Sequence, residues 1–116
     1  AGVVMTGLSA GSLCWFEQGV TAFHGESAPV LGMGLLPHSN AVHYDDKPER
    51  RTAYLRAVAD GMIAGYGTGD GAALHFVGTE LAEVVSSRPK ARACRVTRDG
   101  EAELATRYLG VTLAAA

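Results

Sequence analysis

The chain has 116 residues, a mass of 12.0 kDa and a formal net charge of −2 at pH 7. This length allows one small domain with a core of its own and excludes two. A charge so close to neutral, without a basic stripe, gives no electrostatic basis for binding nucleic acid or a membrane surface. The sequence shows neither a membrane-spanning stretch nor a signal-peptide pattern, so we expect a cytoplasmic location.

Residues 2–12 are the first feature with a chemical meaning. An apolar run at residues 2–7 leads into Gly7-x-Ser9-x-Gly11, the pattern of a nucleophile elbow, where a strand turns sharply into a helix and exposes a serine hydroxyl. We expect both glycines to give the backbone the room for this turn. The motif is short, and Ser9 could equally be the N-cap of the following helix.

The run at residues 2–7 also bears on domain organisation. Its apolar residues do not alternate with polar ones, which is typical of a strand buried on both faces in a parallel sheet. Such a strand needs neighbouring strands on either side. The later strands of this sequence look antiparallel instead. We therefore expect residues 1–116 to form the C-terminal part of a single, larger α/β domain, and to be unstable or inactive when isolated.

The middle of the chain predicts a helix, a strand and a second helix. A short helix is expected over residues 10–18, a polar turn over 20–27 and a strand over 29–37. Asp46-Lys47-Pro48-Glu49 is typical of a helix start, and apolar residues at helical spacing extend this helix to residue 64.

The last part of the chain predicts a loop followed by strands. Residues 65–71 contain so many glycines that we expect a loop. Strand-like runs follow, and Asp99-Gly100 gives a hairpin signal. These runs cover residues 72–77, 81–86, 91–97 and 104–109. Together they predict an antiparallel meander.

The two cysteines, Cys14 and Cys94, are far apart and lack the spacing of a metal site. We expect both to be small buried apolar residues, without a disulfide. The sequence predicts no metal and no cofactor.

Several segments together resemble the peptidase E family of cytoplasmic serine peptidases, which are related to cyanophycinases. They are Gly7-Leu8-Ser9-Ala10-Gly11-Ser12-Leu13-Cys14-Trp15-Phe16, Gly34-Leu35-Leu36-Pro37-His38-Ser39-Asn40, His43-Tyr44-Asp45, Pro48-Glu49-Arg50-Arg51 and Asp70-Gly71-Ala72-Ala73-Leu74. They occur in order over nearly the whole chain.

The resemblance implies an α/β sandwich similar to flavodoxin and to class I glutamine amidotransferases, with Ser9 as nucleophile and His43 as base. Family members are about twice as long, so it also implies an absent upstream half that contributes to the oxyanion hole. Family sequences commonly carry an aspartate shortly after the elbow, and Ala22 stands at the corresponding place here.

The chain has four histidines that could act as the base. His75 falls inside a strand-like run and is expected to be a hydrogen-bonded sheet residue, and His24 to be solvated in a polar loop. His38 and His43 both follow the predicted strand at residues 29–37. His43 is preferred because it precedes a helix, at the kind of loop where catalytic side chains gather in open α/β sheets; His38 is the alternative.

A base needs a carboxylate that fixes its tautomer. Glu17 and Glu26 are the acids nearest to the elbow, and Glu17 is preferred. Asp45 is too close to His43 along an extended chain to face its ring easily. Asp70, between glycines, could equally be a turn residue.

These residues predict a serine peptidase acting on short peptides by acyl transfer. Ser9 would attack, His43 would take and return the proton, and the backbone N–H of Ala10 would help to hold the oxyanion. The resemblance implies cleavage of dipeptides after an N-terminal aspartate. The alternative is an inactive, peptidase-like binding protein, because Ala22 replaces the family acid.

Overall fold

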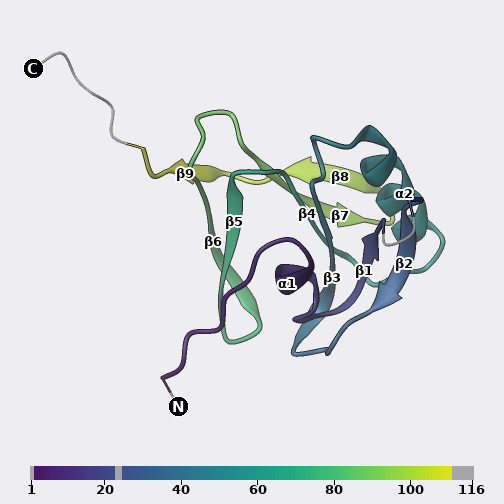
Figure 1. Cartoon of the computed structure of the whole chain (residues 1–116), viewed down its shortest axis with the longest axis horizontal. Helices are drawn as coiled ribbons and strands as arrows, with labels where there is room; N and C mark the ends of the chain where they lie inside the picture. Colours follow the sequence, from purple (N-terminus) through teal and green to yellow (C-terminus); the bar gives the residue numbers. More distant parts are fainter. Residues whose placement is uncertain (1, 23–24, 111–116) are drawn as a thin grey trace, which may run out of the picture.

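The structure is a computed structural model that describes residues 2–22 and 25–110, so His24 lies outside the described residues. It contains short helices and strands in one mixed arrangement (Figure 1). Their bounds are α1 Ala10–Leu13, β1 Phe16–Thr21, β2 Ala28–Leu31, β3 Leu36–Val42, α2 Pro48–Ala59, β4 Gly65–Thr68, β5 Ala72–Val77, β6 Glu80–Ser86, β7 Ala93–Thr97, β8 Gly100–Glu103 and β9 Thr106–Tyr108.

The main layer is a six-stranded sheet with the order β2-β1-β3-β4-β7-β8. Its centre is parallel, since β3 pairs in parallel with both β1 and β4, while β2, β7 and β8 pair antiparallel at the two sides. The helix α1 contacts β1 and β3, and α2 contacts β1, β3, β7 and β8. Strands β5, β6 and β9 form a second, three-stranded sheet. The prediction of a mixed α/β fold is confirmed.

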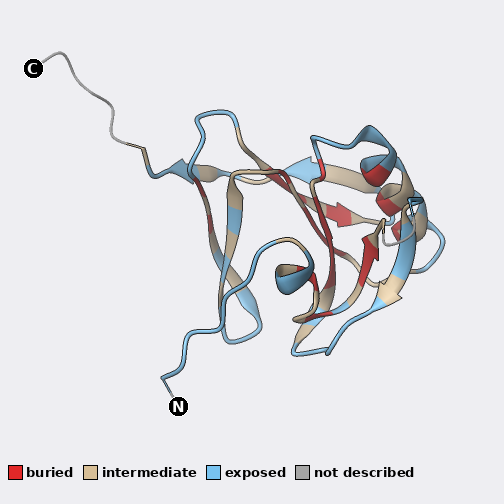
Figure 2. Cartoon of the chain, viewed as in Figure 1, coloured by how far each residue is buried: buried red, intermediate tan, exposed pale blue. Residues whose placement is uncertain are grey.

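The core lies between α2 and the six-stranded sheet, where the buried residues gather in Figure 2. Residues 50, 54 and 58 follow one face of α2 and are all buried, as the helical periodicity requires. The helix is shorter than expected, and its N-cap is Lys47 rather than Asp46. It ends before Gly61, whose φ of 122° breaks the helical path.

Residues 65–68, predicted to lie in a loop, form β4 in the middle of the sheet. Their glycines are required by crowding. A Cβ at Gly65 would collide with the backbone oxygen of Ser39, and one at Gly67 would lie 2.5 Å from the Tyr44 ring. This glycine-rich run therefore marks close packing of a strand, and not the turn that such a run usually indicates.

The predicted strand at residues 2–7 is absent: within the described chain this segment pairs with no strand. Val3, Val4 and Leu8 are 83%, 84% and 85% exposed. The predicted helix over residues 10–18 is also wrong after Leu13, because residues 16–21 pair with two neighbouring strands as β1 and bury Phe16 and Val20. Strand pairing with burial outweighs a weak local helical pattern.

The prediction for residues 29–37 merged two strands. Strand β2 ends at Leu31, the chain turns through Gly34 with φ 74°, and β3 begins at Leu36. The expected polar turn is correspondingly shorter, because β1 continues to Thr21.

The predicted meander is wrong in its connections, although each of its strands exists. Strands β5 and β6 form a hairpin to which β9 adds in parallel, whereas β7 and β8 form a hairpin in the six-stranded sheet. Since β6 and β7 belong to different sheets, the chain does not wind as one antiparallel ribbon. The rings of Phe76 on β5 and Tyr66 on β4 contact edge to face at 5.6 Å, where the two sheets meet.

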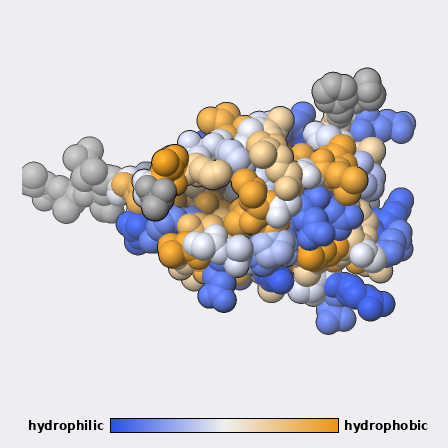
Figure 3. Space-filling model, turned by 90° about the horizontal axis from the view of Figure 1, so that it is seen from below, coloured by the Kyte–Doolittle hydropathy of each residue, from blue (hydrophilic) through white to orange (hydrophobic). Residues whose placement is uncertain are grey.

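Figure 3 shows apolar side chains interspersed with charged ones on the face seen from below. No helix among the described residues has the length and apolar character needed to cross a membrane. Both cysteines are free; Cys94 is buried as expected, but Cys14 is only half-buried.

Candidate active site

Ser9 occupies a strained position immediately before α1. Its φ is 54° and its ψ is −124°, a combination that costs a residue with a side chain about 1–3 kcal/mol. Gly7 makes the turn possible, since a Cβ there would collide with the carbonyl of Gly11. Gly11, by contrast, faces open space within the described structure, so only one of the two predicted glycine roles is a steric requirement.

The side chain of Ser9 does not cap the helix. The structure gives it no capping hydrogen bond, and its Oγ instead lies 3.0 Å from Nε2 of His43. The turn is closed by backbone bonds in which the amides of Ser12 and Leu13 both donate to the Ser9 carbonyl. Ser9 is therefore not a side-chain cap of α1, and its hydroxyl faces the His43 ring instead.

His43 follows the last residue of β3 and has a φ of 56°, which is unusual for a residue with a side chain. Its ring lies between two partners, Ser9 at Nε2 and Asp70 Oδ1 at 2.6 Å from Nδ1. The His43 and Asp70 side chains are 32% and 36% exposed, so the pair is partly shielded from water.

Asp70 is placed by the parallel pairing of β3 and β4. His43 follows β3, and Asp70 comes two residues after β4, so both lie at the carboxyl edge of adjacent parallel strands. Desolvation raises the pKa of the Asp70 carboxyl, but hydrogen bonds with His43 and Asp46 and the charges of His43 and Arg88 lower it below its ordinary value. The carboxylate form is therefore favoured beside the imidazole.

The expectation that Glu17 orients His43 is not met. Glu17 lies exposed on β1, and the carboxylate that bonds to the ring belongs to Asp70. The error follows from the misread β4: with residues 65–71 taken as a loop, nothing placed Asp70 at the end of a strand beside β3. Glu26 is also exposed and has no hydrogen bond to His43 among the described residues. Asp45, as expected, does not face the ring.

The other histidines make different contacts. His38 Nε2 lies 2.9 Å from the carbonyl oxygen of Thr79, and its ring stacks on Phe76. His75 is in β5, as expected, with Glu83 at 4.0 Å. Only His43 has a serine hydroxyl within hydrogen-bond distance in the described structure.

The protonation pattern follows from the partners. A carboxylate can only accept, so Nδ1 of His43 carries the proton toward Asp70, and Nε2 is left to accept the hydroxyl proton of Ser9. This is the tautomer in which an imidazole can act as a general base toward the serine. Among the described residues, no group of three or more metal-binding side chains exists.

A shallow hollow of about 140 Å³ lies beside the elbow, and most of its lining is apolar. Its walls come from α1 with the residue after it, from β1 and from the chain around the end of β2: Ala10, Leu13, Cys14, Gly19, Val30, Leu31 and Gly32.

Comparison with known proteins identifies the family of the chain. The model of peptidase family S51 matches residues 1–84. The chain belongs to this family, and the resemblance to the peptidase E family is confirmed. The chain is 42% identical over 114 residues to an uncharacterized peptidase, YgaJ, of Bacillus subtilis (strain 168), a match that covers 94% of this chain and 50% of that protein. The chain thus spans about half the length of this curated relative. No solved structure matches it.

Proposed function

We infer that this chain carries the catalytic residues of a serine-type peptidase that cleaves short peptides. The observation that carries this proposal is the continuous contact from Ser9 Oγ through the His43 ring to Asp70 Oδ1, at 3.0 and 2.6 Å. Three side chains from separate parts of the sequence meet in the order that acyl transfer needs. Membership of a peptidase family supports the same reaction.

Each group has a definite part in the proposed reaction. Ser9 Oγ attacks the carbonyl carbon of the scissile bond as its proton passes to Nε2 of His43. The imidazolium then returns this proton to the leaving amine, and water releases the acyl group in a second round of the same steps. Asp70 holds the ring and stabilises its charged form.

The oxyanion is assigned to the backbone N–H of Ala10. Ala10 follows the nucleophile and begins α1, and its N–H donates to no acceptor in the described chain. In an elbow this amide points to where the oxyanion develops, and one such donor is worth a factor of about 10² to 10³ in turnover.

The substrate and location are the finer parts of the proposal. We assign dipeptides with an N-terminal aspartate as substrates, following the family resemblance, and no cofactor, nucleic acid or membrane enters the reaction. Two free cysteines are consistent with a reducing compartment, which supports a cytoplasmic location.

The test compares the parent protein, with whatever segment precedes residue 1 in its natural sequence, with its Ser9→Ala variant in fluorophosphonate labelling and in hydrolysis of Asp-X dipeptides. Ser12→Ala is the matched control, since Ser12 lies in α1 on the same turn but takes no part in the proposed chemistry. We expect labelling of the parent and of Ser12→Ala, and none of Ser9→Ala. Equal labelling of all three proteins would refute the proposal.

The alternative, an inactive binding protein, rested on the missing family acid at Ala22. Asp70 supplies a carboxylate to His43 from another element, which weighs against that alternative. Failure of the folded parent to react with fluorophosphonate would favour it again.

A further inference from the structure

His43 and Asp70 lie on two turns outside regular secondary structure. Their contact requires that the two turns keep a fixed position relative to each other. The first, after β3, carries His43 and is closed by a hydrogen bond from the Lys47 amide to the His43 carbonyl at 3.1 Å. The second is residues 69–71, which carries Asp70 between β4 and β5. Strand pairing between β3 and β4 ends at Val42 and Thr68, and beyond it one backbone bond, from the Tyr44 amide to the Thr68 carbonyl at 3.2 Å, holds the first turn to the end of β4.

The side chain of Arg92 binds the first turn. Its Nη2 lies 2.8 Å from Oδ1 of Asp45, and its Nε lies 3.2 Å from Oδ2 of the same carboxylate. This two-point contact fixes direction as well as distance, which a single charge does not. The remaining nitrogen, Nη1, contacts Glu103 Oε1 at 3.2 Å and Cys94 Sγ at 3.4 Å, so β7 and β8 hold the guanidinium from the other side.

The backbone of the same residue binds the second turn. The amide of Gly69 donates to the Arg92 carbonyl at 3.0 Å. A Cβ at Gly69 would lie 2.8 Å from Asp45 Oδ2 and 3.0 Å from the Arg92 oxygen, so these groups enclose Gly69 with no space left. A further bond, from the Asp70 amide to Asp46 Oδ2 at 3.2 Å, joins the two turns directly.

We propose that Arg92, through its ion pair with Asp45, is a positioning residue that sets the distance between His43 and Asp70. The proposal rests on the proposed function of these two residues. Arg92 touches neither of them in the structure and is not a catalytic residue. It acts by tying the base-carrying turn to its guanidinium and the acid-carrying turn to its carbonyl.

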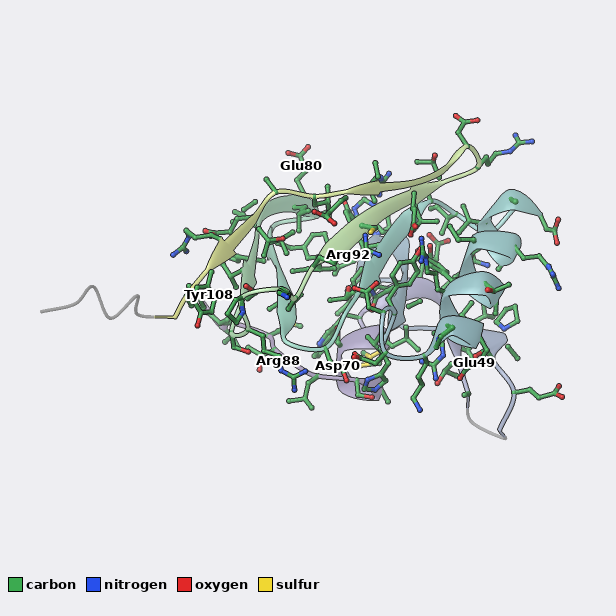
Figure 4. The ribbon with its side chains drawn as sticks, turned by 90° about the horizontal axis from the view of Figure 1, so that it is seen from above. Glu49, Asp70, Glu80, Arg88, Arg92 and Tyr108 are labelled. Carbon is green, nitrogen blue, oxygen red and sulfur yellow. The ribbon has the colours of Figure 1, made fainter. Side chains whose placement is uncertain are left out.

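The location of the pair supports a role beyond surface stability. The side chains of Arg92 and Asp45 are 29% and 30% exposed, less than those of Arg107 and Glu83, at 65% and 38%. The hydrogen bond with Asp45 raises the pKa of Arg92 above its ordinary value, so the guanidinium stays charged throughout the working pH range. Figure 4 shows Asp70 and Arg92 in the middle of the molecule, with Tyr108 at one end and Glu49 at the other.

The experiment uses Arg92→Met, Arg92→Lys, Asp45→Asn and the double variant Asp45→Asn/Arg92→Met. Arg107→Met is the control, because it removes the Arg107–Glu83 ion pair, at 2.7 Å, on the other sheet. Readouts are kcat and KM for dipeptide hydrolysis, the melting temperature, and the downfield proton resonance of His43 Nδ1–H in the hydrogen bond to Asp70.

We expect Arg92→Met to lower kcat by roughly 10- to 100-fold with KM within twofold, because a displacement of about 1 Å has effects of this size. The Nδ1–H resonance should weaken or move upfield. Arg92→Lys should recover only part of the loss, since an ammonium cannot bind both carboxylate oxygens in the same plane. The double variant should be no worse than the more impaired single variant, because both single variants break the same Asp45–Arg92 ion pair.

The proposal is overturned by an unchanged Nδ1–H resonance and kcat in a folded Arg92→Met protein, or by losses in the two single variants that multiply in the double. A loss that Arg107→Met reproduces would also contradict it, since it would reflect general stability. The resonance is measured without substrate, so it tests positioning even if Ser9→Ala labels like the parent and the proposed function fails.

Discussion

Nδ1 of His43 lies 2.6 Å from Oδ1 of Asp70, although 27 positions separate the two residues in the sequence. The contact exists because β3 and β4 are parallel neighbours and end at the same edge of the sheet. It supplies the orienting carboxylate from a strand end, rather than from the segment that follows Ser9.

The first prediction tests this assignment of the acid. Asp70→Asn should lower kcat by about 10⁴-fold, because an amide stabilises the wrong imidazole tautomer and cannot stabilise the imidazolium. Glu17→Gln is the control and should keep the parent turnover, since Glu17 is exposed on β1. The measurement is the kinetics of dipeptide hydrolysis, with folding checked by circular dichroism. Unchanged turnover in Asp70→Asn together with a large loss in Glu17→Gln would contradict the assignment.

The second prediction concerns backbone strain at Ser9. Both Ser9→Gly and Ser9→Ala lose the hydroxyl contact with His43, but only glycine adopts a φ of 54° with a ψ of −124° at no steric cost. Strain of about 1–3 kcal/mol outweighs the roughly 0.5–1 kcal/mol that glycine's freedom adds to the unfolded chain. Ser9→Gly should therefore unfold at higher urea than Ser9→Ala; the opposite order would mean that the turn is relaxed.

The third prediction separates the two glycines of the motif. Gly7→Ala should lower the free energy of unfolding by about 1–3 kcal/mol, because its Cβ would press on the Gly11 carbonyl. Gly11→Ala should be neutral or stabilising by up to about 1 kcal/mol, since Gly11 lies in α1 and faces open space in the described structure. Urea denaturation of the two variants measures both effects, and equal destabilisation would contradict the prediction.

The fourth prediction concerns acid stability through Glu101. Desolvation raises the pKa of this carboxyl, but hydrogen bonds from Tyr44 and Arg51 and the charge of Arg51 outweigh it and lower the pKa below the ordinary 4.5. A carboxyl whose pKa is lower in the folded state contributes stability above its unfolded pKa and loses it as pH falls through the folded pKa. Stability should therefore drop as pH falls below about 4.5.

In Glu101→Gln the free energy of unfolding should fall less steeply below about pH 4.5, while its dependence on pH near neutrality should be unchanged. Glu103→Gln is the matched control, because Glu103 lies on the same strand but does not contact Tyr44. Urea midpoints between pH 3 and 7 give the comparison, and an equally steep fall in Glu101→Gln would contradict the role assigned to Glu101.

The sequence was sufficient where local chemistry determines structure, as at β5 and, to within one residue of the predicted cap, at the start of the Pro48–Ala59 helix. It misled where tertiary pairing overrides local preference. Residues 16–18 look helical but pair as β1, and Gly65 and Gly67 look like a loop but are small because Ser39 and Tyr44 press against them. The contact of Asp70 with His43 could not be predicted for the same reason, because it depends on which strand pairs with β3.

The four-residue helix α1 is attached to the sheet mainly through buried Leu13, whereas His43 and Asp70 follow strands in the middle of it. The nucleophile and its base–acid pair therefore belong to regions whose opening free energies need not be equal. Release of the first thirteen residues would separate Ser9 from His43 and leave the β3–β4 edge intact. Loss of turnover and unfolding of the sheet are then two separate cooperative events. Turnover can be lost in a molecule whose sheet is intact, and most spectroscopic probes would still report that molecule as native.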